Sequence, residues 1–242
     1  MKTLFCRAGN KTPIADKIIN LFPKHKIYVE PFVGSGAVYF HKEPSAVEVL
    51  NDIDTELMKG YRLVKQASSD PSRYKDFDSI EQIQQFYDKT PTTTEDKLTH
   101  SIIRFCNGFS GRAVIHTVGH FRSNPHSKTD DIKKYKDRLK NTILLSQDYK
   151  TVIEKYDSTD TLFYLDPPYE NSSGLYKHHV MDYAELSKTL SNIKGKFILT
   201  IHDSASIRSA FRNHKKRSIL VKARHSQDIS KNDRRELIIT NF

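Results

Sequence analysis

The sequence predicts an α/β fold in which a Rossmann-like sheet is interrupted by a long, mostly helical insert containing a hairpin. The first 54 residues hold two strand-like runs joined by a glycine turn and a short helical stretch. Residues 141–242 hold further strand-like runs, several of which end in aspartate. The segment 55–140 has few such runs and is too long for a loop. We therefore expect one discontinuous domain, 1–54 with 141–242, and an inserted subdomain over 55–140.

The N-terminal unit begins with the strand-like run "KIYVEPF" at 26–32. This run leads into Gly34-Ser35-Gly36, after which "AVYFHKE" is expected to begin a helix. The next strand-like run, "SAVEVLND" at 45–52, ends in Asn51 and Asp52. A strand, a glycine turn, a helix and a second strand that ends in an acid form the opening unit of a Rossmann-like sheet.

The insert shows helical rather than strand periodicity. Apolar residues recur at helical spacing in "ELMKGYRLVKQ", "SIEQIQQFYDK" and the basic segment "DDIKKYKDRLK". The segment "PTTTEDKLTHSIIRFC" begins with helix-start residues and continues with an apolar face. Residues 107–128 contain three glycines and a proline among alternating side chains, which predicts a hairpin or an exposed loop.

The C-terminal part returns to the α/β pattern. Strand-like runs end at Asp148, Asp166 and Asp203, and "RELIITNF" closes the chain as a final strand. Helical segments such as "DYAELSKTLSNI" separate them. The aspartates are expected at the carboxyl edge of the sheet, where α/β proteins bind their ligands.

Composition points to a polyanionic partner without establishing one. Lysine and arginine total 39 against 29 acidic residues, for a formal net charge of +10. No apolar run approaches the length of a membrane span, and no signal-peptide core is present, so we expect a soluble intracellular protein in a prokaryote or a virus-infected cell. Cys6 and Cys106 are too far apart for a CxxC motif and are expected to be buried thiols.

The motif with the most specific chemistry is Asp166-Pro167-Pro168-Tyr169, directly after the apolar run "LFYL". The two prolines stiffen the chain, and the first biases Asp166 toward an extended conformation. The tetrapeptide then presents a carboxylate, an outward carbonyl and an aromatic face. Asp166 and the Pro167 carbonyl can accept both hydrogens of an exocyclic amine such as that of adenine, which frees the nitrogen lone pair, while Tyr169 stacks on the base.

The second motif is the loop "EPFVGSG", which spans Glu30 to Gly36. Its glycines let the backbone turn sharply and approach a ligand. Asp52, at the end of the next strand, can bind both ribose hydroxyls of an adenosine group. The loop is not GxGxxG, which argues against a dinucleotide cofactor.

These motifs, in this order, resemble the Dam-like (D12) class of adenine-N6 DNA methyltransferases. The matching segments are "AGNK" (8–11), "VEPFVGSGAV" (29–38), "LNDID" (50–54), "FCNGFSG" (105–111), "SQDY" (146–149), "DPPY" (166–169) and "ELIITNF" (236–242). The resemblance spans nearly the whole chain. It implies S-adenosylmethionine as the cofactor, no metal, double-stranded DNA as the substrate, and the insert as the target-recognition subdomain.

The resemblance also implies roles for individual residues. Gly9 and Lys11 would lie over the methionine end of the cofactor, and Asp52 would hold its ribose. Asp148 and Tyr149 would contact its adenine. The residues that would form the cofactor loop are Glu30, Phe32, Gly34, Ser35 and Gly36. Asp166 to Tyr169 would receive a target base extruded from the duplex. Many members of the class carry an aromatic residue before the glycine of "GNK", whereas this chain has Arg7-Ala8, which leaves the N-terminal cofactor contacts less defined.

DNA reading is assigned to the hairpin-like segment 107–128. Arginine can read guanine and asparagine can read adenine in the major groove. The candidate DNA-binding residues are Phe109, Ser110, Arg112, Arg122, Asn124 and Pro125. The basic runs Lys133-Lys134, Arg212 to Arg217 and Lys222 to Arg224 are expected to contact phosphates. His116, His120 and His126 do not have the spacing of a zinc site.

Three alternatives stay open. A cytosine-N4 methyltransferase faces the same amine problem, although such enzymes more often begin the tetrapeptide with serine. An adenine-N6 RNA methyltransferase would share the pocket. An inactive nucleic-acid-binding relative would retain the fold without the reaction. The recognition sequence, the oligomeric state and a cognate restriction endonuclease are not determined by the sequence.

Overall fold

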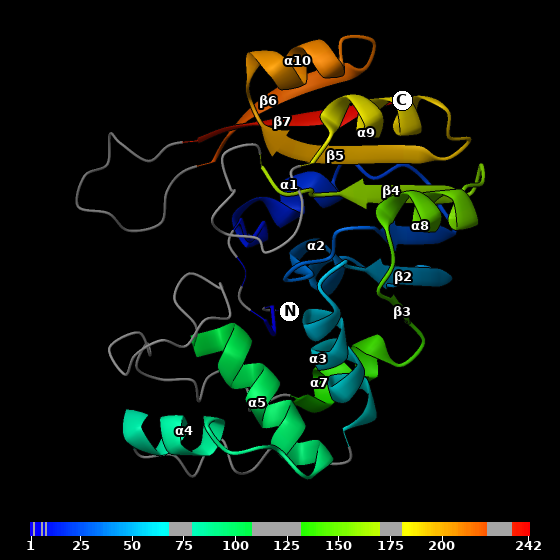
Figure 1. Cartoon of the computed structure of the whole chain (residues 1–242). Coiled ribbons are helices and arrows are strands. Elements are labelled where there is room, and N and C mark those ends of the chain that lie inside the picture. The colour runs from blue at the N-terminus through cyan, green and yellow to red at the C-terminus, as the bar shows by residue number, and fades with distance from the viewer. Residues whose placement is uncertain are drawn as a thin grey trace.

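The computed structural model describes residues 1, 3–5, 7, 9–67, 79–107, 132–169, 181–221 and 234–242. A seven-stranded sheet forms its centre (Figure 1). The strands are β1 (Ile27–Glu30), β2 (Val47–Asn51), β3 (Ile143–Leu145), β4 (Thr161–Leu165), β5 (Lys196–His202), β6 (Lys215–Val221) and β7 (Arg234–Thr240). Their order is β3-β2-β1-β4-β5-β7-β6, and β7 runs antiparallel to both neighbours.

The order of the strands creates a switch point between β1 and β4. The chain starts at β1, moves outward through β2 to β3, and then returns to β4 on the other side of β1. Connections after β1 and β4 therefore diverge, and this leaves a crevice at their carboxyl ends where α/β proteins bind ligands. The Rossmann-like α/β fold predicted from the sequence is confirmed.

Both faces of the sheet are covered, so its strands are apolar throughout. Alternate residues of a strand point to opposite faces. The residues on the first face include Tyr28, Leu162, Tyr164, Ile198 and Ile238, and their chain neighbours on the second face are Val29, Phe163, Leu165, Leu199 and Ile239. This explains runs such as "LFYL", which are continuously apolar rather than alternating.

Helices form the two outer layers. The short helices α1 (Ala15–Ile19) and α2 (Ala37–His41) pack on the first face, preceded by the 3-10 turn η1 (Thr12–Ile14). Helices α8 (Tyr149–Tyr156), α9 (Tyr183–Ser191) and α10 (Ala205–Ala210) pack on the second face, and α8 and α9 lie in front of the sheet in Figure 1. No helix in the described ranges is long and apolar enough to cross a membrane.

The long crossover from β2 to β3 carries the helices predicted for the insert. These are α3 (Thr55–Gln66), α4 (Ile80–Tyr87), α5 (Thr94–Asn107) and α7 (Ile132–Leu139). Thr93 and Asp96 exchange side-chain-to-amide hydrogen bonds at the start of α5, as the helix-start residues of this segment predict. The DNA-reading candidates Phe109 to Pro125 lie outside the described residues.

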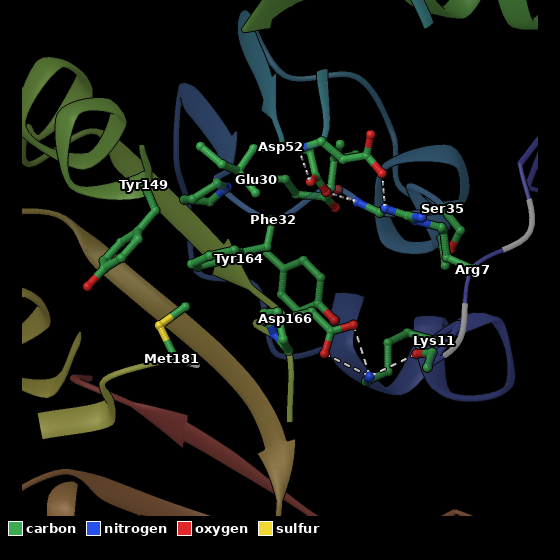
Figure 2. Close-up of a pocket in the computed structure, with 18 of the residues that line it drawn as sticks. Arg7, Lys11, Glu30, Phe32, Ser35, Asp52, Tyr149, Tyr164, Asp166 and Met181 are labelled. Atoms are coloured by element: carbon green, nitrogen blue, oxygen red, sulfur yellow. Dashed lines mark hydrogen bonds and ion pairs between the residues drawn. The ribbon is translucent and has the colours of Figure 1, made fainter. Parts of the chain in front are cut away.

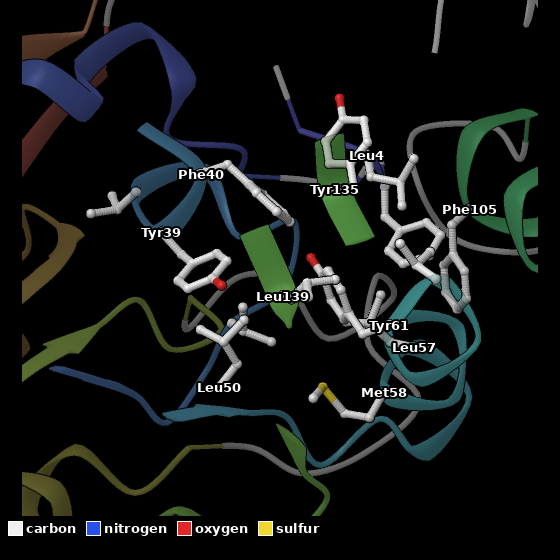
Figure 3. Close-up of a cluster of buried hydrophobic side chains, with 14 of the residues drawn as sticks. Leu4, Tyr39, Phe40, Leu50, Leu57, Met58, Tyr61, Phe105, Tyr135 and Leu139 are labelled. Carbon is white, nitrogen blue, oxygen red and sulfur yellow. The ribbon is translucent and has the colours of Figure 1, made fainter. Parts of the chain in front are cut away.

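The helices of the crossover share a core with the sheet. Tyr61 of α3, Phe105 of α5 and Tyr135 of α7 belong to the same buried cluster as Phe40 of α2 and Leu50 of β2 (Figure 3). Tyr61 lies 6.3 Å from Phe40, and Phe40 lies 5.4 Å from Tyr135, measured between ring centroids. Because the packing is continuous, the boundaries of an inserted subdomain stay a prediction.

One strand was not predicted. Residues 215–221 form β6, the edge strand beside β7, where the sequence analysis identifies only a basic run ending at Arg217. Lys215 and Arg217 are exposed, and Leu220 is 48% exposed. An edge strand with charged residues lacks the apolar pattern that marks a buried strand, and such charges also prevent edge-to-edge association.

Candidate functional site

The loop after β1 is shaped by two glycines in the left-handed region. Gly34 has φ +48° and Gly36 has φ +65°, conformations that other residues rarely adopt. A Cβ at Gly36 would lie 3.0 Å from the Phe40 ring, whereas a Cβ at Gly34 would meet nothing within 4 Å. The Gly36 position is therefore closed by packing against α2, and the Gly34 position lies beside open space.

Asn51 joins the ends of three strands beneath this loop. Its Nδ2 donates to the carbonyl oxygens of Pro31 and Gln147, both at 2.9 Å, and its Oδ1 accepts from the Gln147 amide at 2.9 Å. The Val33 amide donates to the Asn51 carbonyl at 2.8 Å. Asn51 is 1% exposed, so these bonds form where water cannot replace them. Asn51 thus fixes the loop after β1 to the loop after β3.

Asp52 is held by backbone amides. Its carboxylate accepts from the Gly34 amide at 3.0 Å and from the Asp54 amide at 3.0 Å. Burial raises the pKa of Asp52, while the two amides and the nearby Arg7 guanidinium act in the opposite direction. Arg7 itself pairs with Asp54 at 2.5 Å. Asp52, the acid predicted to bind a ribose, is therefore hydrogen-bonded to the glycine loop.

A pocket of about 510 Å³ opens above these elements, in the range typical of small-molecule sites. Figure 2 shows its lining residues converging from the carboxyl ends of β1, β2 and β4 and from the N-terminal segment. The predicted cofactor residues that line it are Gly9, Lys11, Glu30, Phe32, Gly34, Ser35, Asp52, Asp148, Tyr149 and Asp166. Gly36, the last residue of the loop, is not among the lining residues.

One end of the pocket has an aromatic wall. The rings of Phe32 and Tyr149 lie 5.3 Å apart at 35° to each other. Asp148 caps α8 by accepting from the Lys150 amide at 2.8 Å, which places Tyr149 at the first position of that helix. Ile53 also lines the pocket and is 50% exposed. An exposed apolar side chain and two aromatic rings in one pocket suit a flat heteroaromatic ring.

The other end holds an ion pair between Lys11 and Asp166. Nζ of Lys11 lies 2.7 Å from Oδ1 and 2.9 Å from Oδ2 of Asp166 (Figure 2). It also donates to the Gly9 carbonyl at 2.9 Å. Lys11 is 4% exposed, whereas the Asp166 side chain is 21% exposed. The carboxylate therefore faces the pocket, and the ammonium that pairs with it is buried.

Further contacts orient Asp166. Oδ1 accepts from the Thr200 hydroxyl of β5 at 3.2 Å, and Thr200 is itself 3.0 Å from the Tyr164 hydroxyl. Burial raises the pKa of Asp166, and the Lys11 ammonium and Thr200 hydroxyl oppose that rise. The residue is thus a well-oriented hydrogen-bond acceptor whose ionised form depends on Lys11.

The rest of the Asp166–Tyr169 tetrapeptide is anchored to neighbouring elements. The Tyr183 hydroxyl of α9 donates to the Pro168 carbonyl. The Tyr169 ring lies 5.2 Å from the ring of His202 on β5. Pro168 lines the pocket, whereas Pro167 and Tyr169 are outside its lining. The Pro168 carbonyl is thus already hydrogen-bonded to α9, and the acceptor role expected for the Pro167 carbonyl stays a prediction.

Glu30 is buried at the bottom of the pocket. Its Oε1 accepts from the Tyr28 hydroxyl at 2.5 Å and the Tyr39 amide at 3.1 Å, and the residue is 1% exposed. Burial raises the pKa of Glu30 to about 8. Near neutral pH, the carboxyl is therefore largely protonated.

Comparison with known proteins decides the family. A family model described as "D12 class N6 adenine-specific DNA methyltransferase" matches residues 8–227. The chain belongs to this family. The match includes the glycine loop, Asp52, the whole β2–β3 crossover and the Asp166–Tyr169 tetrapeptide. The resemblance found in the sequence is confirmed, and the protein is an adenine-specific DNA methyltransferase of the D12 class.

Individual relatives agree with the family. A "DNA adenine methylase" of Salmonella typhi is 23% identical over 226 residues, covering 83% of this chain and 81% of that protein. "Type II methyltransferase M.CviBI" of Paramecium bursaria Chlorella virus NC1A is 24% identical over 239 residues, covering 87% and 86%. "Type II methyltransferase M.MjaIII" of Methanocaldococcus jannaschii is 26% identical over 197 residues, covering 67% of each chain.

Among solved structures, an rRNA methylase from Streptococcus thermophilus shares 9% identity with a TM-score of 0.38, over 94% of this D12 chain and 92% of that chain. The fold of the D12 chain is established by its own sheet order.

Several residues in or beside the site of this D12 enzyme were not identified from the sequence. Ile53 directly follows Asp52, so its position was available as a signal. Thr200 and Tyr183 carry no local motif and reach the tetrapeptide only because β5 and α9 pack beside β4. Within the described ranges, no group of three or more His, Cys, Asp or Glu side chains could hold a metal ion.

Proposed function

We propose that the protein transfers a methyl group from S-adenosylmethionine to the N6 amine of an adenine extruded from double-stranded DNA at a short specific sequence. The observation that carries this is one continuous pocket, which joins the Asp52 and Phe32–Tyr149 end to the Asp166 carboxylate. Its two ends match the two reactants, an adenosine-containing donor and an amine acceptor.

The residues of the first end fit the cofactor. Asp52 supplies a carboxylate for the ribose hydroxyls, and Phe32, Tyr149 and Ile53 supply an apolar slot for the adenine ring. The open space at Gly34 lets a ligand approach the backbone closely. When bound, S-adenosylmethionine supplies an activated methyl group on a sulfonium.

The residues of the second end fit the target amine. The exocyclic nitrogen of adenine is a weak nucleophile because its lone pair is delocalised into the ring. Asp166 and the Pro167 carbonyl accept its two hydrogens and thereby localise the lone pair on nitrogen. Lys11 and Thr200 hold the Asp166 carboxylate in place. Catalysis then consists of positioning and electrostatic stabilisation, with no covalent enzyme intermediate.

An adenine inside a duplex cannot reach this pocket, so the base must be extruded. The net charge of +10 suits a phosphate backbone, and Lys133 and Lys215 are exposed on α7 and β6. Base reading by Phe109, Ser110, Arg112, Arg122, Asn124 and Pro125 stays a prediction, as do the phosphate contacts. Two relatives are named type II methyltransferases, which supports the search for a cognate restriction endonuclease.

Sequencing that reports modified bases tests the proposal directly. Purified protein is incubated with unmethylated genomic DNA and S-adenosylmethionine. We expect N6-methyladenine within one short motif. Methyl groups on cytosine N4 would agree with the proposed chemistry of the pocket but would show that the target base is cytosine and not adenine. If the protein methylated RNA but not DNA, the proposal of a DNA substrate would be wrong. The family membership favours neither outcome over adenine in DNA.

A further inference from the structure

A second buried carboxylate, Glu236, lies behind the catalytic tetrapeptide. Glu236 is on β7, in register with His202 of β5 and Ile219 of β6, and it is 3% exposed. Its Oε2 lies 3.9 Å from Nζ of Lys11. Glu236 is the first residue of the closing segment 236–242, and it has no role in the proposed mechanism.

Lys11 is therefore an ammonium with two acidic neighbours. An ammonium has three hydrogens to donate, and its close contacts are Oδ1 and Oδ2 of Asp166 and the Gly9 carbonyl, at 2.7, 2.9 and 2.9 Å. The Glu236 contact, at 3.9 Å, is longer than a hydrogen bond. A buried charge is stable only when it is paired. Lys11 has two possible pairing partners, Asp166 and Glu236.

The pairing that holds the Asp166 carboxylate in place also weakens it as a hydrogen-bond acceptor. With Nζ on both carboxylate oxygens, the negative charge of Asp166 is drawn toward the ammonium, and its oxygens accept more weakly from an incoming amine. Methyl transfer from a sulfonium also moves positive charge onto the amine nitrogen. An ammonium bound at Asp166 repels that charge, while a nearby carboxylate stabilises it.

We infer that Glu236 is a positioning residue that receives the Lys11 ammonium when the target amine binds Asp166. This inference rests on the proposed function. A shift of Nζ by about 1 Å would bring the 3.9 Å contact to the length of a charge-assisted hydrogen bond. Lys11 then stays paired, and Asp166 regains the full acceptor strength of its carboxylate.

The surroundings favour this exchange. Tyr169 packs near the pair, with its ring 5.1 Å from Nζ of Lys11. Burial, together with the charges of Asp166 and Glu236, raises the pKa of the Tyr169 hydroxyl, so it stays neutral. The His202 ring lies 5.2 Å from the Tyr169 ring. With Asp166 and Glu236 ionised, one ammonium lies beside two carboxylates, and the surplus negative charge suits a developing cation.

The test is a double-mutant cycle on single-turnover methylation of unmethylated genomic DNA with isotope-labelled S-adenosylmethionine. The wild-type product is first identified as N6-methyladenine, so a failure of the proposed function is detected separately. Glu236→Gln should lower the transfer rate roughly 10- to 100-fold, with affinities for cofactor and DNA within about twofold of wild type. In the Lys11→Met background, Glu236→Gln should have less than about a twofold effect, because Glu236 acts through Lys11.

Equal rate losses in both backgrounds would show a merely structural role and overturn the inference, as would an unchanged rate in Glu236→Gln. Glu154→Gln removes one charge from an exposed position on α8 and should leave the rate unchanged. Glu236→Asp keeps the charge but shortens the reach to Lys11, and it serves if the glutamine variant does not fold. We expect its rate to fall between those of wild type and Glu236→Gln, whereas a wild-type rate would contradict the positioning role.

Discussion

Lys11 and Asp166 are 155 positions apart in the chain, yet the Lys11 ammonium contacts both oxygens of the Asp166 carboxylate, at 2.7 and 2.9 Å. The pair joins the N-terminal segment to the end of β4. It connects the loop of Gly9, predicted to lie over the cofactor, with the acid predicted to bind the target amine. The two halves of the site are thus coupled through one buried ion pair.

Asp166→Ala should abolish methylation while preserving DNA affinity. The variant removes a hydrogen-bond acceptor for the target amine, an interaction whose loss lowers kcat by on the order of 10²–10³-fold or more. Affinity for DNA generally derives mostly from phosphate contacts, and a carboxylate such as Asp166 is not expected to make one. Methylation assays and fluorescence anisotropy measure the two effects. Asp160→Ala, at the opposite end of β4 and 52% exposed, is the matched control and should retain activity. Persistent methylation in Asp166→Ala would show that another residue activates the amine.

Lys11→Met should move the acidic limb of the kcat–pH profile to higher pH. Burial raises the pKa of Asp166, and the Lys11 ammonium opposes that rise. Without the ammonium, the carboxylate becomes protonated at a higher pH and loses its acceptor function there. Single-turnover rates across an acidic pH series give the profile. A limb that stays at the wild-type pH would mean that a different group controls it.

Glu30→Gln should flatten the dependence of stability on pH. The pKa of Glu30 is raised from 4.5 to about 8 in the folded protein. Its contribution to stability is therefore fully present below pH 4.5 and is lost as pH rises through about 8. Glutamine keeps the neutral shape without titrating. Thermal unfolding between pH 5 and pH 8 should show a smaller decline in Tm for the variant. An equal decline in Tm for the variant and the wild type would mean that a group other than Glu30 causes the pH dependence.

Gly36→Ala should destabilise the fold more than Gly34→Ala. Both positions have positive φ, which costs a side chain about 1–2 kcal/mol. At Gly36 the added Cβ also meets the Phe40 ring at 3.0 Å and the Tyr61 hydroxyl at 3.1 Å, whereas at Gly34 it meets open space. Urea unfolding should rank the two variants in that order. Gly34→Ala should instead weaken cofactor binding, measured by calorimetry, because its Cβ stands beside the pocket. The reverse ranking would contradict this assignment.

Asn51→Ala should lower the free energy of unfolding by roughly 2–4 kcal/mol, because it leaves buried backbone groups of Pro31 and Gln147 without their hydrogen bonds. Cofactor affinity should fall as well, since Asn51 holds two loops of the pocket together. Asn192→Ala is the control. Asn192 is exposed at the end of α9, where its side-chain amide donates to the Lys188 carbonyl, and the loss of that bond should matter little. A similar loss in both variants would contradict the role of Asn51.

The features that the sequence determined by itself are local. The glycine loop and the Asp166–Tyr169 tetrapeptide were predictable because glycine and proline restrict the backbone within a few residues, whatever the rest of the chain does. Strands such as β4 were predictable because burial on both faces leaves a continuous apolar run. The charged edge strand β6 was not predicted, because it lacks such a continuous apolar run.

Tertiary structure decided everything that depends on which strands become neighbours. Asp166 accepts a hydrogen bond from Thr200 because β5 pairs with β4. Lys11 lies near Glu236 because β7 is placed between β5 and β6. None of these partners follows a motif, because their contacts join residues far apart in the chain. The sequence alone identifies the reacting groups and the family to which the chain belongs. Only packing of the sheet sets the distances between those groups, and hence which carboxylate holds the ammonium beside the catalytic aspartate.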